Sequence, residues 1–133
     1  MSVLKSQRKE SSIKFLDTAY DLELHTLKCC MKLPKRYTFF IGTELSHLAS
    51  EVHNHCKAAN SIYPTNEHEA QMRRDHLIEA NNCLQALIGK CSVLMELQHG
   101  LSEHALEHWA DLMINEGRLI AGAKKSDKAR FKF

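Results

Sequence analysis

The stretch that decides the fold is residues 35–64, KRYTFFIGTELSHLASEVHNHCKAANSIYP, which follows Pro34 and ends at Pro64. Nothing inside it stops a helix, and its apolar residues recur at steps of three and four, the pattern of a helix with one apolar face. These positions are Ile41, Leu45, Leu48, Val52, Cys56, Ala59 and Ile62. At about 1.5 Å per residue, such a helix is roughly 40 Å long. The rest of the chain must therefore supply helices that cover its apolar face.

Capping residues and helix breakers predict three further helices. The residue before Pro34 disfavours helical geometry, which ends the first helix. Asn66, with Glu69 three residues later, has the spacing of a capping box, and glycine is a common residue just after a helix. The expected bounds are Ser11 or Ser12 to about Lys32 for the first helix, Asn66 to Gly100 for the third, and Ser102 to about Gly122 for the fourth.

Each of these helices also has an apolar face. The expected faces are Ile13, Leu16, Tyr20, Leu24, Leu27 and Met31 on the first helix; Ala70, Leu77, Ala80, Leu84, Leu87, Cys91 and Leu94 on the third; and Ala105, Trp109, Leu112, Glu116, Leu119 and Ile120 on the fourth. Trp109, the single tryptophan, is expected to be mostly buried. Long helices with short connections predict an all-α, antiparallel up-down-up-down four-helix bundle.

Composition fits one domain with basic ends. The chain has 133 residues, of which 44% are hydrophobic and 26% are charged, so residues 1–133 suit a single domain. Residues 1–11 are expected to be a flexible lead, and residues 123–133 a mobile basic tail. Residues 1–10 have a net charge of +2 and residues 121–133 a net charge of +4, which leaves −4 for the segment between them. The ends, rather than the body, are suited to an acidic partner.

The sequence predicts a cytoplasmic protein that does not enter a membrane. No run of about 18 apolar residues is present, and the N-terminus lacks the apolar region of a secretion signal. The five cysteines are an odd number, and none has CxxC spacing. Reduced thiols are the expected state, with those on apolar faces acting as small apolar residues.

No catalytic arrangement is discernible. His104 and His108 are one helical turn apart, but zinc needs three or four converging ligands. Glu96 and His99 have the spacing of one di-iron motif, which needs a second copy on another helix. The chain has no Gly-rich phosphate loop and no nucleophile elbow. We therefore expect no enzymatic activity, no metal and no cofactor, with the nine histidines solvated or hydrogen-bonded.

Some apolar positions are too broadly distributed for one core. Phe39, Phe40 and Ile41 are consecutive and span about 200° of a helix, and Leu112, Met113 and Ile114 repeat the pattern. Two interpretations remain open. One is a wide core with a few exposed apolar side chains, and the other is a second apolar face that contacts another subunit. The second predicts an oligomer interface. Its candidate residues are Phe39, Phe40, Ile41, Met113 and Ile114.

Clusters of basic residues are the remaining functional signal. They are either ordinary solvated charges or phosphate contacts, since lysine and arginine supply most sequence-independent affinity for nucleic acid. The candidates are Lys35, Arg36, Arg73, Arg74, Lys124, Lys125, Lys128 and Arg130, with Lys132 beyond them. In an antiparallel bundle, the first and second pairs lie at opposite ends. Tyr37 and the two phenylalanines near Lys35 could stack on bases, although core or interface use is also open.

Three segments resemble a known family. They are KRYTFFIGTELSHLASEVHNHCKAANSIYPT at 35–65, RRDHLIEANNCLQALI at 73–88 and EHWADLMINEGRLIAGAKKSDKAR at 107–130. Together they resemble the bacterial accessory variability determinant proteins of diversity-generating retroelements. These are related in fold to four-helix proteins encoded in intervening sequences of 23S ribosomal RNA genes. The resemblance covers most of the chain and consists of whole segments rather than a catalytic signature.

The resemblance implies a homopentameric ring that binds the reverse transcriptase of the element and its template RNA. Together they make mutagenic complementary DNA, and the accessory protein is not the polymerase. The implied nucleic-acid contacts are the basic candidates named above. The net charge is only +2, which is small for a protein that binds free nucleic acid. The reverse transcriptase is therefore expected to be the more important partner. The alternative that remains open is a stand-alone four-helix protein-interaction module without a nucleic-acid role.

Overall fold

A computed structural model describes residues 10–133, and within this range the chain is helical without strands. The four long helices are α2 (Glu10–Lys32), α4 (Thr43–Ser61), α5 (Glu67–Met95) and α6 (Glu103–Arg130). A short helix, α3 (Lys35–Tyr37), and a π-helical segment, η1 (Thr38–Gly42), precede α4 without a break. The expected all-helical fold with four long helices is confirmed. The expected lead at residues 1–11 lies mostly outside the described residues, and α2 already begins at Glu10.

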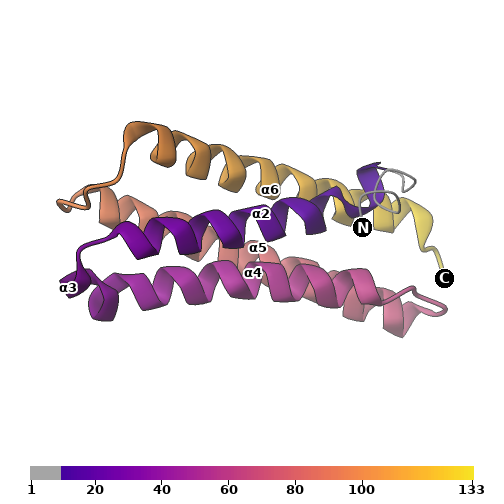
Figure 1. The fold of residues 1–133 in the computed structure, drawn as a ribbon. Helices are drawn as coiled ribbons and strands as arrows, with labels where there is room; N and C mark the ends of the chain where they lie inside the picture. Colours follow the sequence, from indigo (N-terminus) through magenta and orange to yellow (C-terminus); the bar gives the residue numbers. More distant parts are fainter. Residues whose placement is uncertain (1–9) are drawn as a thin grey trace.

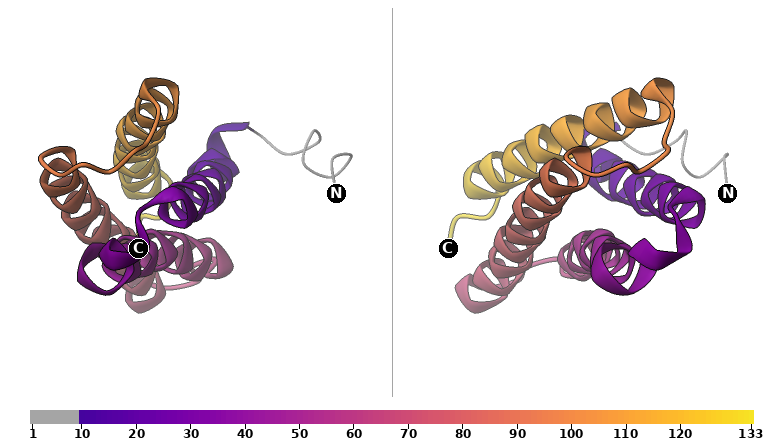
Figure 2. Two further views of the ribbon diagram at one scale, coloured as in Figure 1. Left: turned by 60° about the vertical axis from the view of Figure 1, so that its left-hand side comes forward. Right: turned by 90° about the vertical axis from the view of Figure 1, so that its left-hand side faces the viewer.

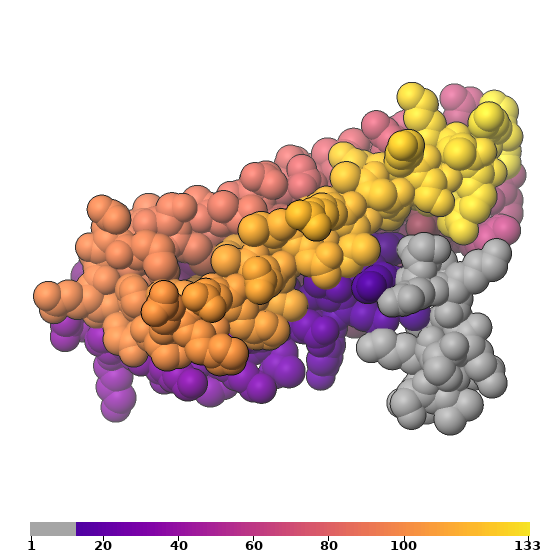
Figure 3. Space-filling model, turned by 90° about the horizontal axis from the view of Figure 1, so that it is seen from above, coloured from indigo at the N-terminus to yellow at the C-terminus, as the bar shows by residue number. Residues whose placement is uncertain are grey.

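The four long helices lie side by side as a bundle (Figure 1). Each packs on two others, because α2 contacts α4 and α6, and α5 contacts the same two helices. The junction of α2 with α3 and the loop between α5 and α6 lie at one end, while the α4–α5 turn and the C-terminus lie at the other (Figure 1). Figure 2 shows that the helices diverge rather than run strictly parallel. In Figure 3, α6 crosses the molecule with α5 along one side and α2 along the other.

The apolar face predicted for residues 35–64 does form the centre of the core. Leu45, Val52, Cys56 and Ala59 are fully buried, although Leu48 and Ile62 are only partly covered. On α5, every predicted position except the half-buried Ala70 is buried. Trp109 is 1% exposed, as expected, and its Nε1–H donates a hydrogen bond to the Thr26 hydroxyl at 2.9 Å. A buried indole N–H needs such a partner.

The face predicted for the first helix was wrong at three of its six positions. Tyr20, Leu24 and Met31 are exposed by 56%, 41% and 79%. Ile13 is buried as predicted, but the rest of the buried face is Phe15, Thr18, Ala19, Leu22, Thr26 and Cys29, with Leu33 just beyond the helix. Both faces have helical spacing, so periodicity alone could not separate them. The buried one contains small side chains, which let the neighbouring helices approach, and the hydroxyl that Trp109 requires.

The π-helical segment η1 is the local feature that periodicity did not predict. Its turn is closed by Thr43, whose backbone N–H and hydroxyl both donate to the Thr38 carbonyl, the hydroxyl at 3.0 Å. A π turn contains an extra residue and often marks a functional position. Here the wider turn buries Ile41 at 5% exposure while Phe39 and Phe40 point outward at 87% and 80%.

Two helix starts are confirmed and two ends are corrected. The side chains of Asn66 and Ser102 accept hydrogen bonds from the third backbone N–H after them, at 2.9 and 3.1 Å. However, α5 ends at Met95, and Gly100 lies in the following loop, where its positive φ of 73° suits glycine. The frayed tail expected from Gly122 is also wrong, because α6 continues to Arg130.

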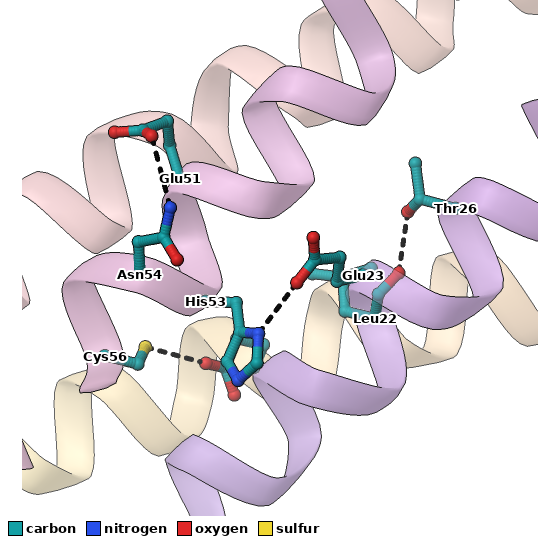
Figure 4. Close-up of polar contacts among 8 residues, drawn as sticks. Leu22, Glu23, Thr26, Glu51, His53, Asn54 and Cys56 are labelled. Carbon is teal, nitrogen blue, oxygen red and sulfur yellow. Dashed lines mark hydrogen bonds and ion pairs between the residues drawn. The ribbon is translucent and has the colours of Figure 1, made fainter.

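Polar side chains join the helices inside and beside the core (Figure 4). The Thr26 hydroxyl donates to the Leu22 carbonyl at 2.7 Å, and His53 Nδ1 donates to Glu23 Oε1 at 2.7 Å across α4 and α2. The Cys56 thiol donates to Glu116 Oε2 at 3.3 Å. Glu116 is fully buried, and burial raises the pKa of Glu116 to about 8. The five cysteines are free thiols, and Cys29, Cys56 and Cys91 are buried.

Candidate nucleic-acid interface

A cleft lies between the start of α5 and the end of α6, at the end of the bundle that holds the C-terminus. Its volume is about 460 Å³, and its lining contains three of the predicted nucleic-acid contacts. The lining residues are Glu67, Ala70, Gln71, Arg74, Lys124, Asp127, Lys128 and Phe131. We call this the basic cleft. Bringing Arg74 of α5 together with two lysines of α6 was not predicted from the sequence.

The helices place these cations by simple register. Asn66 caps α5, so Arg74 falls near its beginning, on the exposed side. Lys124 and Lys128 are four residues apart on α6 and therefore share one face of that helix. They do so only because α6 continues past Gly122. The three cations meet two carboxylates in the cleft, Glu67 and Asp127, and Asp127 is already engaged within the protein.

Arg73 is not available for phosphate, which corrects the prediction for this residue. It is 5% exposed, and its Nε–H donates to Asp127 Oδ2 at 2.6 Å. One guanidinium nitrogen, Nη1, also donates to the carbonyls of Ala59 and Ile62 at 2.8 and 3.3 Å. Carbonyls at a helix C-terminus lack partners inside their own helix. Arg73 therefore fastens the end of α4 to α5 and α6.

Aromatic rings lie beside the basic cleft. Phe131 lines it, and Tyr63 meets the Phe131 ring edge to face, with 5.8 Å between centroids. The Arg130 guanidinium carbon lies 4.6 Å from the centre of the same ring. Tyr63 is 80% exposed. Sequence reasoning missed both aromatics, because it looked for stacking rings near Lys35 and did not place the α4–α5 turn against the C-terminus.

The remaining basic candidates lie elsewhere. Lys35 and Arg36 are exposed at the opposite end of the bundle, where the Arg36 guanidinium lies 5.1 Å from the Tyr37 ring centre. Lys125 is exposed but does not line the cleft. Arg130 pairs with Asp127 at 3.6 Å. The candidates thus fall into one cluster around the cleft and one separate pair.

Some of the residues predicted for an oligomer interface are exposed, and others are buried. Phe39, Phe40 and Ile114 are exposed by 87%, 80% and 55%. Ile41 is buried in the core of the same chain at 5% exposure, which corrects its assignment to an interface, whereas Met113 is 7% exposed and lines an apolar groove between α5 and α6. Each was predicted as part of a run of three consecutive apolar residues, and neighbouring residues on a helix point about 100° apart.

The histidines serve local contacts. His25 Nε2 donates to the Ala105 carbonyl at 2.9 Å, and burial lowers the pKa of His25. His108 meets the His25 ring edge to face, with 4.6 Å between centroids. Within residues 10–133, no three His, Cys, Asp or Glu side chains converge in a way that could hold a metal ion.

Comparison of the chain with protein-family models, curated proteins and solved structures gives no match. In the part of the chain that the structure describes, no helix combines the length and apolar character needed to span a membrane.

Proposed function

We propose that this protein is a non-enzymatic accessory subunit of a diversity-generating retroelement, which binds the reverse transcriptase and template RNA and supports synthesis of mutagenic complementary DNA. The observation that supports nucleic-acid binding is the convergence of Arg74, Lys124 and Lys128 on one cleft beside Tyr63 and Phe131. Its assignment to this kind of element comes from the resemblance of residues 35–65, 73–88 and 107–130.

The chemistry of the basic cleft suits single-stranded nucleic acid. Proteins that bind single strands combine a positive groove along the backbone with aromatic rings on which bases stack. Lysine and arginine at the cleft would contact phosphates, while the exposed Tyr63 ring would accept a base. Such contacts select for a strand rather than for its sequence. This fits an accessory role, in which another component reads the template.

The proposed assembly is a ring of five antiparallel up-down-up-down bundles. The exposed Phe39 and Phe40 supply an apolar contact that one chain leaves uncovered. In a cyclic ring with the bundles parallel to its axis, every basic cleft lies on the same rim. Several clefts would then meet one RNA molecule, and linked sites raise the overall affinity well above that of one cleft.

The test of RNA binding uses two triple variants with the same loss of charge. Arg74→Gln/Lys124→Gln/Lys128→Gln removes the cations of the cleft. The control, Lys28→Gln/Lys57→Gln/Arg118→Gln, removes three cations placed elsewhere. We expect the first to weaken binding of single-stranded RNA about tenfold or more at low salt, because phosphate contacts dominate affinity. Equal affinities of the two variants would contradict the assignment of the cleft.

A stand-alone interaction module is the second candidate, favoured by an apolar groove between α5 and α6. The gene neighbourhood separates the two functions. A retroelement component should be encoded beside a reverse transcriptase and a pair of near-identical repeats. Co-expression should then give a complex that contains the polymerase. A purified protein that binds neither RNA nor that polymerase would favour the stand-alone module.

A further inference from the structure

Another concave surface of the protein is apolar and lies between α5 and α6. It has a volume of about 260 Å³ and is lined mainly by Ile88, Met95, Leu106, Ala110, Met113 and Ile114. Ser92 contributes the one hydroxyl, which already donates to the Ile88 carbonyl at 3.1 Å. We call this surface the α5–α6 groove. Its lining contains no charged residue. A ligand would therefore be held by its shape and by apolar contact.

The protein also has an apolar protrusion, formed by Phe39 and Phe40 in η1. The two rings meet edge to face at 5.6 Å between centroids, and both are at least 80% exposed. Exposed aromatic rings of this size are costly in water, since each buries about 150–250 Å² when it is packed. A cavity of about 150 Å³ holds one benzene ring, so the α5–α6 groove admits a phenylalanine ring.

The protrusion and the groove lie at the same level along the bundle. Glu44, just after η1, pairs with Lys90 in α5 at 3.4 Å, and the groove begins at Ile88 of α5. Seen from this end of the molecule, α3 and η1 lie beside α4, while the loop from α5 to α6 crosses another side (Figure 2, right). Surfaces at one level on different sides can join identical subunits into a closed ring by rotation about an axis parallel to the bundle.

Apart from Glu44 and Lys90, which pair with each other, the exposed charges next to the two surfaces in the chain are opposite in sign. Lys32, Lys35 and Arg36 are exposed around the phenylalanine pair. Glu96, Glu103 and Glu107 are exposed around the groove, and the last two share a face of α6 with Ala110 and Ile114. Joining the pair of one chain to the groove of another brings opposite charges together. Joining two phenylalanine pairs would bring like charges together, which disfavours that contact.

We propose that the Phe39–Phe40 pair of one copy packs on the α5–α6 groove of a second copy, with one of the two rings inside it and with Lys35 and Arg36 facing Glu103 and Glu107. The occupant of the groove is thus another molecule of this chain. Lys35 and Arg36 act in assembly, which leaves the basic cleft for nucleic acid. The inference rests on the assembly within the proposed function, but it requires neither RNA nor reverse transcriptase. Its failure is therefore distinguishable from failure of RNA binding.

The test uses two variants that each lose one half of the contact. Phe39→Glu/Phe40→Glu damages the protrusion, and Ala110→Glu/Ile114→Glu damages the groove. All four positions are exposed, so the bundle should remain folded. The control, Leu24→Glu/Met72→Glu, adds the same charges at exposed apolar positions on α2 and α5 that do not line the groove. Masses are measured by light scattering on nuclease-treated protein at tens of micromolar, with helicity checked by circular dichroism.

We expect the wild type and the control to be oligomers and each double variant to be monomeric. Mixing the two double variants should give a one-to-one dimer, since one intact protrusion and one intact groove remain. Only a contact between unlike surfaces gives this rescue. A monomeric wild type, double variants that stay oligomeric, or a mixture without the dimer would overturn the proposal.

A second pair of variants covers the case in which a glutamate in the groove unfolds the chain. Lys35→Glu/Arg36→Glu and Glu103→Lys/Glu107→Lys each place like charges across the contact, so each alone should lose the oligomer. Mixed in equal amounts, they should assemble in alternation, because the glutamates of the first variant meet the lysines of the second and the remaining protrusion and groove keep their original charges. This assembly should weaken as salt rises. Absence of association in this mixture would also overturn the proposal.

Discussion

Glu116 is a carboxylic acid that the fold keeps away from water. It is fully buried, its Oε1 has no hydrogen-bond partner among the described residues, and Oε2 accepts from the Cys56 thiol. Burial raises the pKa of Glu116 to about 8 from the ordinary value of 4.5. The native state therefore holds the proton at pH values where the unfolded chain releases it.

This difference makes stability depend on pH in a defined direction. Because the folded pKa lies above the unfolded one, the stabilising effect of the proton is complete below pH 4.5, is lost as pH rises toward 8, and is absent above it. The loss is on the order of 5 kcal/mol. Glu116→Gln stays neutral at every pH, so the free energy of unfolding in urea should fall less between pH 5 and 8.5 than in the wild type. The same fall in both proteins would contradict the raised pKa.

Trp109 connects α6 to α2 through both packing and a hydrogen bond. Trp109→Ala should lower the free energy of unfolding by about 3–5 kcal/mol, because it leaves a cavity and removes the donor to the Thr26 oxygen, whose own bond to the Leu22 carbonyl remains. A control at an exposed position, Tyr63→Ala, should change it by less than about 1 kcal/mol. Native fluorescence typical of an indole in water would contradict the burial of Trp109, which is 1% exposed.

At the scale of elements, periodicity predicted the helices better than their faces and ends. The faces of α4 and α5 were readable because each has one apolar stripe. On α2 two stripes compete, and only contact with Trp109 decides between them. The ends of α5 and α6 depend on tertiary contacts, and the π turn at Thr38–Gly42 depends on a local hydroxyl bond. None of these features repeats along the chain, so the spacing of apolar residues could not predict them.

The candidate site, like the helices, could be predicted from the sequence only in part. The sequence identified Arg74, Lys124 and Lys128 as cations, but their meeting in one cleft depends on how α5 and α6 pack. Arg73 looked identical to Arg74 in sequence, yet one is buried and the other exposed. The difference is one step of about 100° around α5.

The last turns of α6 belong to the fold, because Asp127 pairs with the buried Arg73. Asp127→Ala should lower the free energy of unfolding by about 3 kcal/mol, since it leaves the guanidinium buried without its carboxylate. Asp111→Ala, at an exposed position on the same helix, is the control and should have little effect. Truncation after Ala123 should destabilise the bundle similarly. Equal denaturation curves for the two alanine variants would contradict this role of Asp127.

At the scale of the whole molecule, the two surfaces to which we assign functions lie at opposite ends of one bundle. The basic cleft adjoins the C-terminus, and the phenylalanine pair with the α5–α6 groove lies toward the α5–α6 loop. Assembly through one end would leave the other free for RNA. Because the two surfaces are separate, we predict that the cleft variant remains an oligomer. The phenylalanine variant should be monomeric and should still bind RNA weakly through its single cleft.

The most direct measurement of the central claim is the salt dependence of RNA affinity. Affinity for a single-stranded RNA is measured from low to moderate salt for the wild type, the cleft variant Arg74→Gln/Lys124→Gln/Lys128→Gln and its control. Each phosphate contact on a single strand contributes about −0.7 to the slope of log affinity against log salt. We predict that the cleft variant has a slope shallower by about 2 per chain engaged and that the control keeps the wild-type slope. Identical slopes for all three proteins would contradict binding of RNA by the basic cleft.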